Sequence, residues 1–274
     1  MSRSLSDLEA KLVLHLEWER RPVVTIDEAM AILDCSYDHA RQVLHRLARR
    51  RWLAPITAGK YELIPAERGE HAFANTNPLF IGSVLIEPYY FSYATAAFFH
   101  GLSTQASATV YIATSTRTGR NLVHVRGKEY RMVLQPPHKF FGSVEVDAYG
   151  SRVSMAEPEK TVVDALDRPQ YVGDIPEIAG MLQRGHGRLN PDKLVEYGLR
   201  FESQALVQRL GYLLDCLDLL LTEDTRGRLL AGVGKSTPYL GRPKRWGTGG
   251  VYDATWRLVD NVPRRELRAE IEVR

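Results

Sequence analysis

The sequence is poor in cysteine and has no long apolar run. Its 274 residues include only Cys35 and Cys216, which lie far apart in the chain. Two isolated thiols are more typical of a reducing cytoplasm than of a disulfide framework. No segment approaches the roughly 20 apolar residues that a membrane-spanning helix needs. The first residues, MSRSLSDLEAKL, lack an apolar signal region and carry acids early. We therefore expect a cytoplasmic protein without a membrane partner.

Recognisable catalytic and metal-binding patterns are also lacking. The eight histidines are scattered, and neither cysteine has a ligand neighbour at zinc spacing. No Ser/His/Asp or Cys/His set can be assembled. Residues 232–237 (GVGKST) resemble the end of a P-loop, but Leu229 stands where that motif needs glycine and Pro238 follows at once. We expect no metal, no cofactor and no catalytic site.

The N-terminal residues show a clear order of secondary structure. Leucines recur on one helical face over 5–20. Thr25 and Glu28 form a capping box that opens a second, short helix. A serine N-cap begins a third helix over 36–50, and 52–64 has the pattern strand, turn, strand. Three helices followed by a hairpin is the order of a winged helix-turn-helix.

This first domain, 1–70, is polarised by charge. Residues 1–38 carry eight acids against four bases, whereas 39–61 contain no acid. One stripe of the third helix combines side chains suited to reading base edges: Asp38, Gln42, His45 and Arg49. The groups expected to contact phosphates are Ser36, Tyr37, Arg41, Arg46, Arg50, Arg51 and Lys60. The pattern favours double-stranded DNA as the partner. A three-helix unit for protein contacts, with solvated arginines, stays open as an alternative.

A second domain is expected over 80–274, after a polar linker at 66–80. Short β-like runs at 81–86, 109–113, 121–125, 130–134 and 144–146 are interrupted by a small-residue helix at 92–100. Helical patterns follow at 159–166, 175–183, 191–197 and 202–221, and 251–259 is a last strand. The fold class is therefore α+β: an N-terminal winged helix-turn-helix, then a mixed β-sheet plus a helical C-terminal domain.

A basic stretch near the C-terminus contains no acid from 226 to 252. Its cations are Arg226, Arg228, Lys235, Arg242, Lys244 and Arg245, with Tyr239 and Trp246 interleaved. Basic residues among aromatics are one way to hold a nucleic acid. A solvated, flexible loop explains the same pattern equally well.

Four segments of the second domain follow one another in a specific order. They are 90–102 (YFSYATAAFFHGL), 153–166 (VSMAEPEKTVVDAL), 168–174 (RPQYVGD) and 256–261 (WRLVDN). Together they resemble motifs of the AbiEi-type antitoxin and transcriptional regulator family. Lys160 stands where that family often has arginine, and Asp174 replaces the second glycine of its Pro…Gly-Gly stretch.

The resemblance implies an antitoxin of a bacterial toxin–antitoxin, or phage-defence, pair. Its winged helix would bind inverted repeats at its own promoter and repress the operon. Its C-terminal domain would counteract a nucleotidyltransferase-like toxin without a stable complex. Operators with two half-sites need two copies of the protein, by dimerisation or by cooperative binding.

Two other interpretations of the second domain remain. One is a DNA-targeted nuclease or modification enzyme acting near 157–164, and the other is an antitoxin that blocks its toxin by direct binding. The residues themselves suggest a structural role. Glu157 and Glu159 suit the positive end of a helix, and Pro158 suits its first position. Asp164 could cap a helix or pair with a basic side chain nearby. His100 precedes a glycine, which is typical of a helix end.

Overall fold

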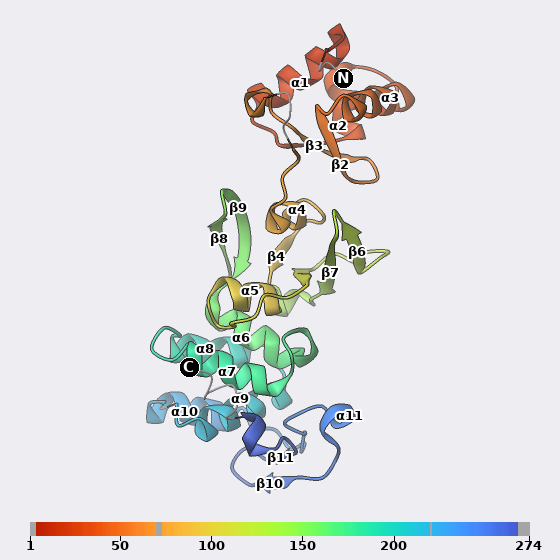
Figure 1. The fold of residues 1–274 in the computed structure, drawn as a ribbon. Helices are drawn as coiled ribbons and strands as arrows, with labels where there is room; N and C mark the ends of the chain where they lie inside the picture. The colour runs from red at the N-terminus through yellow and green to blue at the C-terminus, as the bar shows by residue number, and fades with distance from the viewer. Residues whose placement is uncertain (1–3, 70–72, 220, 268–274) are drawn as a thin grey trace. The chain divides into compact units, whose positions relative to one another are not determined.

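The computed structural model describes residues 4–69, 73–219 and 221–267 (Figure 1). The chain forms two compact units: unit 1 is Met1–Leu85 with His124–Lys128, and unit 2 is Ile86–Val123 with Glu129–Arg274. The expected boundary at 70–80 therefore lies too early. Residues after 70 belong to unit 1, because the Asn75 amide donates a 2.7 Å hydrogen bond to the buried Glu62 carboxylate.

Unit 1 contains three helices and a small sheet in the winged-helix order. Its elements are α1 (Asp7–Trp18), β1 (Val23–Thr25), α2 (Ile26–Leu33), α3 (Tyr37–Arg49), β2 (Leu53–Thr57), β3 (Lys60–Leu63), the 3-10 turn η1 (Ala66–Arg68) and α4 (Pro78–Ser83). The sheet has the order β1-β3-β2 and is antiparallel. Residues 81–86, expected to be extended, instead belong partly to α4, which Asn77 caps and Pro78 begins.

Local sequence signals explain how the helices of unit 1 begin. The Thr25 hydroxyl accepts the Glu28 amide while the Glu28 carboxylate accepts the Thr25 amide, as the capping box predicts. A second capping box, Ser6 with Glu9, opens α1. The helices meet in one core formed by α1, α2 and α3, whose fully buried members include Leu12, Leu16, Ala29, Val43, Leu44 and Leu47.

Unit 2 begins with a six-stranded mixed sheet of order β6-β7-β5-β4-β9-β8. The strands are β4 (Tyr89–Phe91), β5 (Thr109–Thr114), β6 (Leu122–Val125), β7 (Lys128–Leu134), β8 (Ser143–Ala148) and β9 (Ser151–Ala156). Pairing is parallel for β5 with β7 and for β4 with β9, and antiparallel for β4 with β5 and for β8 with β9. Strands β4 and β9 were not expected from the sequence, because β4 is a three-residue buried run without alternation.

Helices make up most of the rest of unit 2. They are α5 (Tyr93–Phe99), α6 (Pro158–Asp167), α7 (Ile175–Arg184), α8 (Pro191–Arg200), α9 (Gln204–Cys216), α10 (Glu223–Ala231) and α11 (Pro243–Trp246), with 3-10 turns η2 (Pro137–Lys139) and η3 (Pro169–Tyr171). Two short antiparallel strands, β10 (Val251–Asp253) and β11 (Leu258–Asp260), replace the single strand expected at 251–259. Trp256 is buried between them, against Gly211 of α9.

The long helix expected at 202–221 is also corrected. It ends at Cys216, and Asp218 adopts a left-handed conformation with φ 53°. Thr222 then caps α10, so the first part of the basic stretch is helical. None of the helices in the described parts of the chain is long and apolar enough to cross a membrane.

Candidate nucleic-acid interface

Helix α3 presents opposite faces to the core and to solvent. Ala40, Val43, Leu44 and Leu47 are fully buried. The four side chains expected to face bases, Asp38, Gln42, His45 and Arg49, are all exposed. The charged and amide groups of this stripe are thus accessible on a helix whose other side is fixed by packing, which is the arrangement of a recognition helix.

Exposed groups that could reach phosphates lie at both ends of α3. Ser36 caps the helix by accepting the His39 amide at 3.4 Å, and its hydroxyl proton remains able to donate. Tyr37 is half exposed, and Arg41 and Arg51 are exposed. The N-terminus of α3 also carries the positive end of the helix dipole.

Arg46 of α3 and Arg50, the C-cap of this helix, have a partner within the protein. Nε of Arg46 donates to Oε1 of Glu9 at 3.1 Å, and Nη1 of Arg50 donates to Oε2 of Glu9 at 2.6 Å. Glu9 lies in α1, and its side chain is only 1% exposed. Both arginines therefore also join α3 to α1, and their expected phosphate contacts stay a prediction because each guanidinium keeps further N–H donors. The sequence could not show this, because the acid lies about forty residues before the bases.

The environment of Glu9 also sets its ionisation. Burial alone raises the pKa of the Glu9 carboxyl. Hydrogen bonds from the Ser6 amide and from Arg46, with the nearby charge of Arg50, outweigh burial and lower the pKa below its ordinary value. Glu9 is thus a carboxylate that the fold keeps ionised.

Lys60 is not at the tip of the wing. It is the first residue of β3, paired with Thr25 of β1, and its ammonium group donates to the Val84 carbonyl. The turn itself is formed by Ala58 and Gly59, where glycine has φ 77°. The ammonium keeps two N–H donors beyond this bond, so the expected phosphate contact of Lys60 stays a prediction.

A cation that the sequence analysis missed belongs to unit 1. Arg126 donates to Oε2 of Glu62 at 2.6 Å and to the Asn75 carbonyl at 2.8 Å. Exposed Lys128 lies in the same short segment, His124–Lys128. No signal near 1–70 indicates these residues, because they come from a hairpin over fifty residues further along the chain.

The C-terminal basic stretch is more neutral than its sequence suggests. Arg226 donates to Asp215 at 2.8 Å, Arg242 donates to Asp174 at 3.0 Å, and Arg245 donates to the Gly173 carbonyl at 2.8 Å. The remaining three cations are exposed: Arg228, Lys235 and Lys244. The acids that pair with the stretch come from other elements, so half of the expected basic surface is engaged within the fold.

Comparison with known proteins gives a fold. No protein-family model matches this chain, and no curated protein does. Among solved structures, the chain is similar to the crystal structure of the RV2827C protein from Mycobacterium tuberculosis. The TM-score is 0.63 and the identity 19%, over 98% of this chain and 96% of that one. The two share an architecture. It is a mixed α+β fold with winged-helix-like N-terminal helices and a three-stranded sheet, a six-stranded mixed sheet and a helical C-terminal region.

The acids at the start of α6 are held by structural hydrogen bonds. Glu157 accepts from Lys193 at 2.7 Å and from the Tyr197 hydroxyl, and Glu159 accepts the Asn190 amide at 2.7 Å. These bonds join α6 to α8. In the described residues, no group of three or more His, Cys, Asp or Glu side chains could hold a metal ion.

Lys160 and Asp164 form an ion pair at the centre of unit 2. Both side chains are 0% exposed. Asp164 also accepts from the Ser92 hydroxyl at 2.6 Å, and Lys160 donates to the Tyr90 hydroxyl at 2.9 Å. Burial lowers the pKa of the Lys160 ammonium and raises the pKa of Asp164, while each partner opposes the shift of the other. The pair connects the segment 90–102 with 153–166.

His100 ends α5, as its place before Gly101 predicted. Its Nε2 lies 2.6 Å from the Ala156 carbonyl. Burial lowers the pKa of the His100 imidazole. The neutral ring therefore acts as a link between α5 and β9.

Proposed function

We propose that the protein is a DNA-binding transcriptional repressor of its own operon and the antitoxin of a bacterial toxin–antitoxin pair. One observation carries the DNA-binding part. Gln42, His45 and Arg49 are exposed along one side of α3, while the other side is buried and two neighbouring arginines, Arg46 and Arg50, donate to Glu9. The stripe is thus accessible on a helix whose orientation is fixed by its buried face and by the bonds to Glu9.

In a complex with DNA, α3 would lie in the major groove. Arg49 suits the O6 and N7 acceptors of guanine, and Gln42 suits the N6 and N7 groups of adenine. Asp38 can accept from the amino group of cytosine. The phosphate contacts would come from Arg41 and Arg51, from the hydroxyls of Ser36 and Tyr37, and from the helix N-terminus. The donors that Arg46, Arg50 and Lys60 do not use within the protein would add to them.

The antitoxin part rests on the resemblance of unit 2 to the AbiEi-type family. The two longest motifs contact each other through their polar members: Ser92 with Asp164, and Tyr90 with Lys160. Because these motif residues bond one another within unit 2, the fold needs both motifs. This supports the resemblance, which depends on the order of the motifs along the chain. The activity against a nucleotidyltransferase-like toxin remains part of the proposal.

Footprinting on the DNA upstream of the protein's own gene tests the DNA-binding part. We expect protection of two half-sites whose centres lie one helical turn, about 10 bp, or a multiple apart. A Gln42→Ala/Arg49→Ala double variant should lose the footprint. Affinity for the same DNA unchanged by that double variant would exclude α3 as the reading element.

Salt dependence separates phosphate contacts from base contacts. Arg41→Ala and Arg51→Ala should each reduce the slope of log K against log salt by about 0.9, because each releases one counterion fewer. Lys60→Ala should reduce the slope likewise, because its ammonium keeps its charge and two N–H donors beyond the bond to Val84. A slope unaltered by Arg41→Ala and Arg51→Ala would contradict the assigned contacts.

Co-expression with the adjacent gene tests the antitoxin part. The protein should rescue growth from its toxin without co-purifying with it. A stable complex would favour the direct-blocking alternative. Metal-dependent cleavage of plasmid DNA that is lost on Glu159→Ala would favour the enzyme alternative, although Glu159 is engaged by the Asn190 amide.

A further inference from the structure

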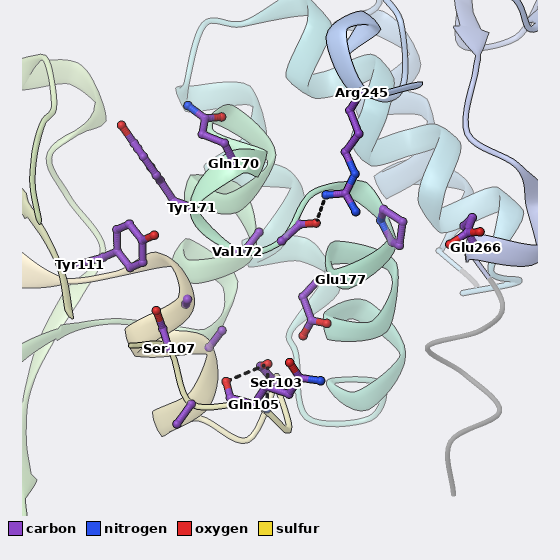
Figure 2. A pocket seen from close by; sticks show the side chains of 15 residues that line it. Ser103, Gln105, Ser107, Tyr111, Gln170, Tyr171, Val172, Glu177, Arg245 and Glu266 are labelled. Atoms are coloured by element: carbon purple, nitrogen blue, oxygen red, sulfur yellow. Dashed lines mark hydrogen bonds between the residues drawn. The ribbon is translucent and has the colours of Figure 1, made fainter. Parts of the chain in front are cut away.

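Two hollows of unit 2 share the side chain of Tyr171, whose ring contacts that of Tyr111 at a tilt. The ring of Tyr111 in β5 lies 5.2 Å from that of Tyr171 in η3, at an interplanar angle of 39°. Tyr171 lines both a hollow of about 410 Å³ and a second of about 450 Å³. Figure 2 shows the first hollow, in which Tyr111 and Tyr171 lie near each other on one side.

A buried network fixes this aromatic wall from behind. The ring of Tyr93 contacts Tyr171 at 5.2 Å and Tyr111 at 6.1 Å, edge-on in both cases. The Tyr93 hydroxyl accepts a 2.7 Å hydrogen bond from Gln135, and the same amide lies 3.3 Å from Asp164. Tyr93, which contacts both rings of the wall, is thus connected through Gln135 to the Lys160–Asp164 pair. We expect the rings to keep these positions when a flat ligand binds.

The second hollow is basic and rich in hydroxyls. Arg117 is exposed at its rim, and Arg168 lies beside it with the nearest carboxylate, Asp167, at 3.6 Å. That carboxylate already accepts a 2.7 Å hydrogen bond from Lys139. The lining also includes Thr116, Thr118 and Asn121. None of the residues that line this hollow is acidic, and two of them, Arg117 and Arg168, are cations.

The first hollow differs in charge. Its polar lining includes amide and hydroxyl groups and two carboxylates: Ser103, Gln105, Gln170, Glu177 and Glu266. Glu177 is paired with Arg184 at 2.7 Å, and Arg245 reaches the Gly173 carbonyl, as the dashed line in Figure 2 shows. This hollow offers donors and acceptors to a neutral polar ligand and is unsuited to phosphate.

We propose that unit 2 binds a nucleotide across these two hollows, with the base against Tyr111 and Tyr171 and the phosphates at Arg117 and Arg168. Each volume lies in the range of small-ligand sites, about 300–1,000 Å³. Base stacking on aromatic rings and arginine–phosphate bonds are the usual means of holding such a ligand. The carboxylates of the first hollow would repel phosphates, so the sugar and the edge of the base would lie there.

The ionisation of the wall suits this ligand. The Tyr111 phenol is neutral near pH 7 at its ordinary pKa, and burial raises that pKa further, so its hydroxyl can donate. A phenolate there would repel the phosphates. This support is secondary to the geometry of the two hollows.

Isothermal titration of the full-length protein with ATP, GTP, CTP and UTP tests the proposal, alongside tripolyphosphate and a short single-stranded oligonucleotide. At least one nucleotide should bind more tightly than tripolyphosphate. Arg117→Ala and Arg168→Ala should each weaken it about tenfold, the loss expected for one charge-assisted bond. Arg152→Ala, which removes an exposed arginine of β9, is the matched control.

Variants of the wall separate stacking from charge. Tyr171→Ala should weaken nucleotide binding about tenfold without changing tripolyphosphate binding, whereas Tyr171→Phe should retain affinity because the ring remains. Tighter binding of the oligonucleotide would support the same site with a strand as the source of the nucleotide. The Gln42→Ala/Arg49→Ala variant should bind nucleotides normally, so failure here is distinct from failure of the DNA-binding proposal.

Three results would overturn the inference. The first is no binding of any nucleotide or of the oligonucleotide. The second is affinity unchanged by Arg117→Ala and Arg168→Ala. The third is equal binding of tripolyphosphate and nucleotides. Because Arg117 is exposed and has no role in the core, its variant keeps the test valid even if Tyr171→Ala fails to fold.

Discussion

Nε of Arg46 in α3 donates a 3.1 Å hydrogen bond to the buried carboxylate of Glu9 in α1. Arg50, the C-cap of α3, donates to the other oxygen of the same carboxylate. One acid therefore positions the helix that carries the exposed stripe. Arg46 and Arg50, which the sequence analysis assigned to phosphate binding, thus also hold the third helix against the first.

Glu9→Gln should loosen the first helix of unit 1 against the third. The loss should be about 1.5 kcal/mol, the low end for hydrogen bonds to charged groups, because both arginines are more than a third exposed and water can replace the carboxylate. Amides of α1 and α3 should then exchange hydrogen about tenfold faster. Glu19→Gln, at an exposed site, is the control; equal protection in the two variants would contradict the role of Glu9.

The same carboxylate predicts a pH dependence. The pKa of Glu9 is lowered in the folded state from 4.5, so its contribution to the free energy of unfolding is complete above that value. The contribution is lost as pH falls from 4.5 towards the lower folded pKa. Hydrogen exchange of α3 across this window should fall in protection more steeply for the unaltered protein than for Glu9→Gln. Parallel profiles would show that Glu9 does not titrate with folding.

The buried pair of unit 2 should be costly to break on one side only. Lys160→Met leaves the Asp164 carboxylate without its cation at a site that is 0% exposed, and should cost about 3–5 kcal/mol. Adding Asp164→Asn should restore more than half of this loss, because the neutral amide can still accept from Ser92. Urea unfolding followed by tryptophan fluorescence, to which the buried Trp256 of unit 2 contributes, provides the measurement. No recovery in the double variant would contradict a charge-pairing role.

Sequence patterns predicted the features of unit 1 that depend on interactions between residues close in the chain. The capping box at Thr25, the buried face of α3 and its exposed stripe follow from neighbours within a few residues, and the structure has all three. The order of three helices and a hairpin followed in the same way. The winged-helix-like architecture is shared with the RV2827C protein at the level of the fold.

Partners distant in sequence could not be predicted. Glu9 is separated from Arg46 by 37 residues, and Glu62 from Arg126 by 64 residues. The charge pattern of a sequence stretch gives its number of basic residues, but it does not show which acidic residue from another part of the chain pairs with them in the fold. The same reason explains Arg242, which is held by Asp174 from a different helix terminus. The strand β4 was not predicted because a run of three residues is too short to show a period.

The most direct test of the account compares Arg49→Ala with Arg46→Ala. Fluorescence anisotropy would measure the affinity of each full-length variant for the DNA upstream of its own gene, and for a scrambled duplex, at one salt concentration. Arg49→Ala should lose about 1–3 kcal/mol of preference for the specific site, whereas Arg46→Ala should keep that preference. Equal losses of specificity in the two variants, or none in Arg49→Ala, would contradict the exposed stripe of α3 as the surface that reads DNA.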